Sequence, residues 1–238
     1  MAPPNAAPRA ATARERVRAE LSREIKEEAR RQLAASGAGG LSLRAVAREL
    51  GMVSSALYRY YPSRDDLLTA LIIDAYNALG DAAEGATAAG TAAAWPTAGQ
   101  AAAGHPVPAR ERWIAACHAV RDWARANPHE YALVYGSPVP GYRAPAATSG
   151  PAARVPLAFA GLLGDALARG ELGGACGTCG AGGAALPPDV LVRAVIAWTQ
   201  LYGMISFELF GQFIGSFEPA DALFAHTAQQ LAAFVGLR

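Results

Sequence analysis

Residues 41–68 carry the side chains of this chain whose types and spacing best suit contact with a nucleic acid. Hydroxyl, phenol and guanidinium groups follow one another closely there: Ser54, Ser55, Tyr58, Arg59 and Tyr60. Such groups bond to phosphate oxygens and to the edges of bases. These side chains can contact a nucleic acid together only if helices hold them on one surface. The residues around them predict such helices.

Two short helices joined by a turn are predicted over this segment. Apolar residues at helical spacing give the first helix a buried stripe: Leu43, Val46, Ala47 and Leu50. Ser42 can cap its start, and Gly51 follows its last apolar residue, where a left-handed conformation favours glycine. Ser54 or Ser55 can cap the second helix, which Pro62 ends. A helix pair this compact can place its second helix in the major groove of DNA.

The same segment resembles the TetR/AcrR family of transcriptional regulators, whose pattern is roughly L-S-x-R-x-(V/I)-A-x-x-x-G-(V/M)-S-x-x-(A/T)-L-Y-x-(H/Y)-F-x-(S/N)-K-x-x-L. The chain matches without gaps at Leu41, Ser42, Arg44, Val46, Ala47, Gly51, Met52, Ala56, Leu57, Tyr58, Tyr60, Ser63 and Leu67. Val53 replaces the usual capping serine, so the cap is expected to move to Ser54. Tyr61 replaces a phenylalanine, and Arg64 replaces the usual lysine while keeping its charge.

The resemblance implies a set of DNA-binding residues: Ser42, Arg44, Ser54, Ser55, Tyr58, Arg59, Tyr60 and Arg64. The two adjacent serines and Tyr58 would lie at the DNA-facing end of the recognition helix. Arg44, on the preceding helix, would reach a base edge or the backbone, while Tyr60 and Arg64 would hold phosphates.

Positive charge is concentrated near the N-terminus. Residues 9–66 contain 12 Arg or Lys and 8 Asp or Glu, a net charge of +4, whereas the rest of the chain carries −3. This asymmetry supports phosphate contact at one end, although a solvated helix surface can show a similar balance. No apolar run of about 18 residues and no apolar leader core is present, and three cysteines suit a reducing compartment. We therefore expect a cytoplasmic protein without a membrane span.

Helical periodicity without convincing strand alternation predicts an all-α fold. Besides the short pair, helices are expected at about residues 10–36, 63–84, 108–127, 152–170, 188–214 and 219–237. Residues 10–62 are expected to form a three-helix DNA-binding domain with a helix-turn-helix. Residues 63–238 are expected to form a helical bundle for ligand binding and dimerisation.

A second group of residues, in the C-terminal half, is expected to line an apolar ligand pocket: Trp113, Cys117, His118, Trp123, Tyr131, Tyr135, Trp198 and Tyr202. The alternative is an ordinary helical core in which Trp and Tyr bond their polar atoms. The resemblance favours an effector pocket in this half. Residues 127–138 and 198–208 further resemble a C-terminal subfamily with the pattern W-x-x-L-H-G, in which Tyr202 replaces the histidine.

No cofactor, metal site or catalytic motif is expected. The four histidines lack ligand spacing, and neither a Gly-rich loop ending in Lys-Ser/Thr nor a G-x-S-x-G elbow is present. Cys176 and Cys179 have the spacing of a redox pair or of half a zinc site, but the chain has no second such pair, and a glycine-rich loop is poorly suited to tune a thiolate. Glu208 interrupts an apolar helix, where it could orient a ligand, pair across a dimer interface or simply face solvent.

The last two helices are strongly apolar, and the resemblance implies a two-fold homodimer through them. Burial within one monomer is the alternative. The resemblance further implies a repressor that a small, largely apolar effector releases from a pseudo-palindromic double-stranded DNA operator. Two other functions stay open: an effector-independent activator or architectural DNA-binding protein, and a small-molecule binding protein with a vestigial helix-turn-helix.

Overall fold

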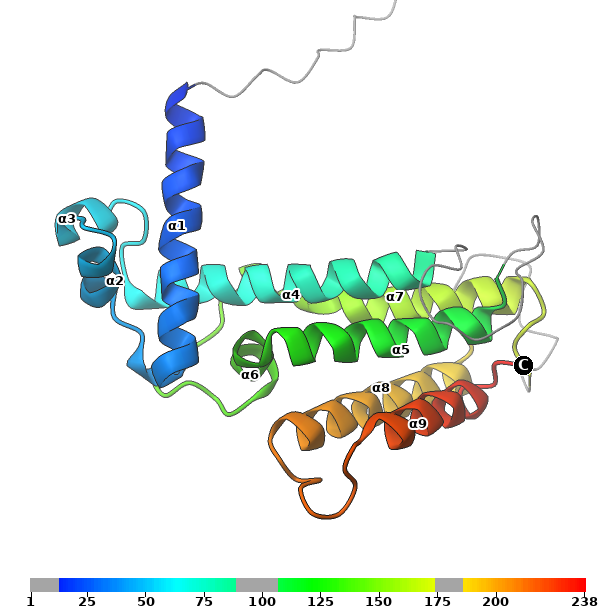
Figure 1. Ribbon diagram of the computed structural model, residues 1–238. Helices are drawn as coiled ribbons and strands as arrows, with labels where there is room; N and C mark the ends of the chain where they lie inside the picture. The colour runs from blue at the N-terminus through cyan, green and yellow to red at the C-terminus, as the bar shows by residue number, and fades with distance from the viewer. Residues whose placement is uncertain (1–12, 89–106, 174–185) are drawn as a thin grey trace, which may run out of the picture. The chain divides into compact units, whose positions relative to one another are not determined.

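The computed structural model describes residues 13–88, 107–173 and 186–238, and the regular elements within these ranges are all helical (Figure 1). The α-helices are α1 (Ala13–Ser36), α2 (Leu43–Glu49), α3 (Ser54–Leu57), α4 (Arg64–Ala88), α5 (Ala109–Ala126), α6 (Pro128–Tyr135), α7 (Ser149–Ala168), α8 (Pro188–Leu209) and α9 (Asp221–Phe234). Two short 3₁₀ turns are η1 (Ala38–Gly40) and η2 (Ala146–Thr148). The predicted all-α fold is confirmed.

The chain divides into two compact units. The first contains residues 1–71 together with 139–142, and the second contains residues 72–138 and 143–238. The predicted domain boundary after residue 62 precedes α4, whereas α4 itself begins in the first unit and continues into the second.

The core of the first unit lies between α1, α2, α3 and the start of α4. Its buried apolar side chains are Ile25, Ala29, Leu33, Leu43, Val46, Ala47, Leu57, Leu67 and Leu68. The sequence predicts that Val17 and Leu21 continue the buried stripe of α1, but Val17 is 66% exposed and Leu21 is only half-buried. The buried stripe therefore covers only the C-terminal half of α1.

The turn between α2 and α3 is largely as the sequence predicts. The Ser42 hydroxyl accepts a hydrogen bond from the Ala45 amide at 3.4 Å, and Gly51 adopts the left-handed conformation with a φ of 64°. The predicted serine cap of α3 is wrong. Ser54 is already the first helical residue, and Val53 precedes it in an extended conformation without a side-chain cap.

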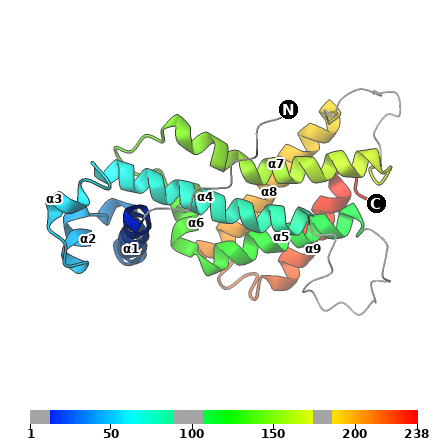
Figure 2. The same cartoon turned by 90° about the horizontal axis from the view of Figure 1, so that it is seen from above.

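Helix α5 is central to the second unit, where it packs against α6, α7, α8 and α9 (Figure 2). Large buried side chains come from each of these layers: Trp113, Val120, Tyr131, Phe159, Leu163, Leu201 and Phe224. Helices α8 and α9 lie side by side (Figure 1). Helix α8 ends at Leu209 rather than near residue 214, because Gly211 and Gly215 take positive φ values of 77° and 75° in the following turns.

Candidate DNA-binding surface and effector pocket

The side chains predicted to read DNA are gathered on α2 and α3. Arg44 on α2 is exposed, as are Ser55, Tyr58 and Arg59 on or directly after α3, while Ser54 is partly exposed. Leu57 faces the opposite way and is fully buried, which fixes the short helix to the core of the first unit. The helix therefore presents hydroxyl, phenol and guanidinium groups together on one accessible side.

Arg64 has a structural role that the sequence does not reveal. Its Nε donates to the Leu41 carbonyl at 3.2 Å and its Nη2 donates to the Ala38 carbonyl at 2.5 Å. These bonds tie the start of α4 to η1 and the residue after it. The phosphate contact expected of Arg64 stays a prediction. Arg64 would have to make that contact while keeping these two hydrogen bonds.

The two tyrosines after α3 are positioned by α1. The Tyr61 hydroxyl is 2.9 Å from Ser22 Oγ, and the Tyr61 ring is buried. The Arg18 guanidinium lies over the Tyr60 ring, 5.7 Å from its centroid. Tyr60, expected to hold a phosphate, therefore lies within reach of a cationic side chain of α1.

A small apolar pocket of about 90 Å³ lies between α5, α7 and α8 in the second unit. Its lining residues are Trp113, Pro156, Phe159, Ala160, Leu191, Ala194, Val195, Ala197, Trp198 and Leu201. Two of them, Trp113 and Trp198, belong to the predicted ligand-binding set. The Nε1 atoms of both indoles are buried and have no hydrogen-bond partner among the described residues. A buried N–H group without an acceptor is the kind of donor that a bound ligand can satisfy.

Three other predicted pocket residues form an aromatic cluster. The rings of Tyr135 and Tyr202 have centroids 4.3 Å apart, and Tyr131 stacks on Tyr202 at 6.4 Å. The Tyr131 hydroxyl is 2.8 Å from Ser206 Oγ and donates to the Tyr202 carbonyl at 3.2 Å. Burial raises the pKa of Tyr131 and that of Tyr135 to about 12, so both phenols are neutral at physiological pH.

The remaining predicted pocket residues face the core around α5. Cys117 is fully buried, and burial raises the pKa of its thiol. His118 packs edge-on against Phe224 at 5.3 Å, and burial lowers the pKa of its imidazole. Trp123 is partly buried against the same core. Their assignment to the effector site stays a prediction.

An ion-pair cluster that the sequence does not predict joins α5 to the ends of α8 and α9. Buried Arg121 donates to both carboxylate oxygens of Glu208, at 2.7 and 2.6 Å, and pairs with Asp221 at 2.8 Å. Arg125 pairs with Asp221 at 3.1 Å. Arg121 holds the pKa of the Asp221 carboxyl below its usual value. Glu208 is therefore paired within its own chain.

A second unpredicted cluster joins α7 to α4. Arg154 donates to Glu84 at 2.8 and 2.6 Å, to Asp81 at 2.5 Å, and to the carbonyl and side-chain oxygens of Asn77 at 2.9 and 3.1 Å. Gly80 leaves the space for this side chain, because a Cβ at that position would lie 2.9 Å from Arg154 Cβ. Arg154 of α7 thus bonds to residues spread over two turns of α4.

The described residues contain no group of three or more His, Cys, Asp or Glu side chains that could hold a metal ion. Cys176 and Cys179 lie outside the residues that the structure describes. By length and composition alone, α8 is long and apolar enough to cross a membrane, although no membrane span was expected from the sequence. A core helix of a soluble protein meets the same criterion.

Comparison with known proteins identifies both parts of the chain. Residues 25–71 match the model of the bacterial regulatory proteins of the tetR family, and residues 113–231 match the tetracyclin repressor-like C-terminal domain. The HTH-type transcriptional regulators Rv1816 of Mycobacterium tuberculosis (strain ATCC 25618 / H37Rv) and Mb1846 of Mycobacterium bovis are each 40% identical over 209 residues. Each alignment covers 82% of this chain and 83% of the relative.

Solved structures agree with this assignment. The crystal structure of the putative regulatory protein SCO4313 has a TM-score of 0.72 and 33% identity, and the match covers 93% of this chain and 100% of that one. A protein of unknown function from Rhodococcus sp. RHA1 has a TM-score of 0.68 at 24% identity, covering 91% of this chain and 95% of that one. The second likeness shows the fold alone.

The fold, the exposed side chains of α3 and these matches define a helix-turn-helix DNA-binding transcriptional regulator with a separate C-terminal effector domain. The chain belongs to the TetR family. The predictions of a TetR-type regulator and of a protein that is not an enzyme are confirmed. As a regulator of transcription it acts on DNA inside the cell. The W-x-x-L-H-G subfamily stays a prediction.

Proposed function

We propose that the protein is a cytoplasmic, homodimeric repressor that leaves a pseudo-palindromic operator when a small effector binds its C-terminal domain. The observation that carries operator recognition is the exposed set on α2 and α3, Arg44, Ser55, Tyr58 and Arg59, within the segment that matches the tetR family. Side chains that reach base edges specify a sequence, and those that reach phosphates set the register.

The chemistry of the pocket supports a neutral, largely apolar effector that carries a hydrogen-bond acceptor. No charged side chain is among its lining residues, so a carboxylate entering it would lose its hydration without gaining a cation. The indole N–H groups of Trp113 and Trp198 instead suit a carbonyl or ether oxygen. At about 90 Å³, the pocket suits a compact group rather than a long chain.

The apolar surface of α8 supports dimerisation. Large apolar side chains about half exposed lie in the N-terminal half of α8 and again at its C-terminal end: Leu191, Val192, Val195, Ile196, Phe207 and Phe210. Exposed large apolar side chains that gather on one element usually mark an interaction site. A second copy of the chain would cover this surface if α8 and α9 of the two copies formed a four-helix bundle. No membrane is then needed to bury these side chains.

The proposed function is tested by selecting bound sequences from a random pool of DNA duplexes, at two salt concentrations. We expect enrichment of a palindrome whose half-sites are about one helical turn apart, with an affinity that falls as salt rises. Substitution of Ser55 should then change the preferred bases, because it is expected to face a base edge. Binding without enrichment would favour an architectural protein, and absence of binding at low salt would favour a vestigial helix-turn-helix.

A further inference from the structure

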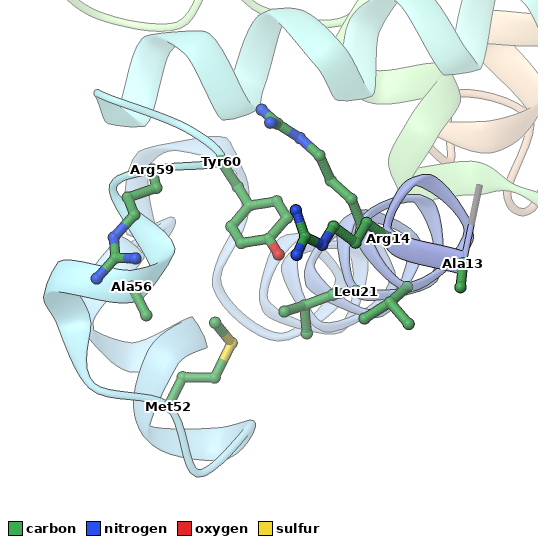
Figure 3. A pocket seen from close by; sticks show the side chains of 9 residues that line it. Ala13, Arg14, Leu21, Met52, Ala56, Arg59 and Tyr60 are labelled. Carbon is green, nitrogen blue, oxygen red and sulfur yellow. The ribbon is translucent and has the colours of Figure 1, made fainter. Parts of the chain in front are cut away.

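A wide groove opens in the first unit between the N-terminal half of α1 and α3, with a volume of about 530 Å³ (Figure 3). Its lining residues are Ala13, Arg14, Val17, Arg18, Leu21, Met52, Ala56, Arg59 and Tyr60. They come from α1, from the turn after α2, and from α3 with the residues that follow it. The groove therefore directly adjoins the helix expected to read the operator.

The groove exists because the apolar stripe of α1 is longer than the core that covers it. Ile25 and Leu33 are buried, whereas Val17, on the same stripe, is 66% exposed. The floor of the groove is accordingly apolar, formed by Val17, Leu21, Met52 and Ala56. Leaving this surface to water is unfavourable, so an occupant that covers it would gain from its burial.

The rim of the groove is positively charged. Three of its nine lining residues are arginines, Arg14, Arg18 and Arg59, and none is acidic. Arg14 and Arg18 are four residues apart and so lie on the same face of α1. The Arg18 guanidinium also lies over the ring of Tyr60. Arginines of two elements thus line one groove, which suits a polyanion with apolar surface between its charges.

We propose that this groove binds the sugar–phosphate backbone of the operator beside the bases contacted by α3, so that Arg14 and Arg18 extend the DNA interface onto α1. Phosphates meet the arginines on the rim, and the C–H surface of deoxyribose covers the apolar floor. The charge of the rim and its continuity with α3 favour DNA as the occupant. This proposal rests on the proposed operator recognition.

The salt dependence of operator binding tests the proposal in the full-length protein. The logarithm of the binding constant falls with the logarithm of the salt concentration, with a slope of about −0.9 for each phosphate neutralised. Arg14→Ala and Arg18→Ala should therefore each make the slope about 0.9 shallower. Each should also weaken all operator variants to a similar degree, because backbone contacts carry no sequence information.

Arg16→Ala is the matched control. It removes the same charge from the same exposed stretch of α1, but Arg16 does not line the groove. We expect its slope to equal that of the unsubstituted protein. If the unsubstituted protein binds its operator but Arg14→Ala, Arg18→Ala and Arg16→Ala all give the same slope, the groove proposal is wrong and operator recognition still stands. Absence of salt-sensitive binding by the unsubstituted protein would overturn both proposals. Unchanged thermal unfolding of each variant would show that the fold is retained.

Discussion

At the scale of single residues, Trp113 and Tyr131 show two ways in which a buried polar group is accommodated. The Tyr131 hydroxyl is bonded to Ser206 and to the Tyr202 carbonyl, so it belongs to the packed interior. The Trp113 N–H has no acceptor among the described residues. An unpaired buried donor costs about 1–3 kcal/mol, which an acceptor on a ligand would recover.

Trp113→Phe is expected to weaken binding of cyclohexanone about fivefold to tenfold more than binding of methylcyclohexane, which has the same number of heavy atoms. The ketone loses one hydrogen bond, worth about 1 kcal/mol, whereas both compounds lose the same apolar contact. Calorimetric titration of the full-length protein with each compound measures the difference. Equal weakening of the two, or no binding of either to the unsubstituted protein, would contradict the proposed pocket chemistry.

At the scale of elements, Arg121 holds three helices together. It lies on α5, is only 3% exposed, and bonds Glu208 near the end of α8 and Asp221 at the start of α9. Removing one partner of a buried ion pair leaves the other without compensation, which is strongly destabilising. Exposed pairs contribute much less, because water screens them.

Arg121→Met is expected to lower the free energy of unfolding by about 3 kcal/mol, and Arg125→Met, at a half-exposed site, by less than about 1 kcal/mol. Urea denaturation measures both. Because Arg121 lowers the pKa of Asp221, the contribution of this pair is present at neutral pH and is lost as the pH falls below the ordinary aspartate value of 3.8. Equal losses for the two variants would show that Arg121 has no special role.

The element scale also shows what the sequence can predict. Apolar periodicity and caps are local, so most helices, the all-α fold and the exposed residues of α3 were predictable. The end of α8 was not, because residues 210–214 stay largely apolar while the backbone of Gly211 ends the helix. The partners of Arg121 and Arg64 were not predictable either. Glu208 is 87 residues from Arg121, and Arg64 bonds carbonyls 23 and 26 residues away, so only packing brings them together.

At the scale of the whole molecule, we expect α4 and α7 to transmit the proposed effector control to the DNA-binding segment. Helix α7 contributes Pro156 and Phe159 to the pocket. Its Arg154 also bonds to α4, at Asn77, Asp81 and Glu84. Helix α4 begins in the unit that contains the helix-turn-helix. An effector changes DNA affinity only if it favours one arrangement of such a connection over another.

Arg154→Gln is expected to reduce the effector-induced loss of operator affinity by about tenfold, within the usual range of coupling between sites. Affinity without effector should change little, because Arg154 does not belong to the DNA-binding unit. Operator binding with and without effector measures both. Arg169→Gln is the control, since Arg169 follows α7 and pairs with Glu171 instead of α4. A response that is intact in Arg154→Gln, or equally reduced in both variants, would refute this route.

Because α4 is one continuous helix, it also restricts how chimeras of this protein can be built. Arg64 attaches one end of the helix to η1, and Asn77 to Glu84 attach a later stretch to α7. Each residue of an α-helix adds a rotation of about 100° and a rise of about 1.5 Å. A single inserted residue between the two attachments would turn one against the other by that angle, whereas seven would come close to two full turns. Hybrids that join this N-terminal segment to another effector domain should therefore keep the number of residues between the attachments, or change it by whole heptads.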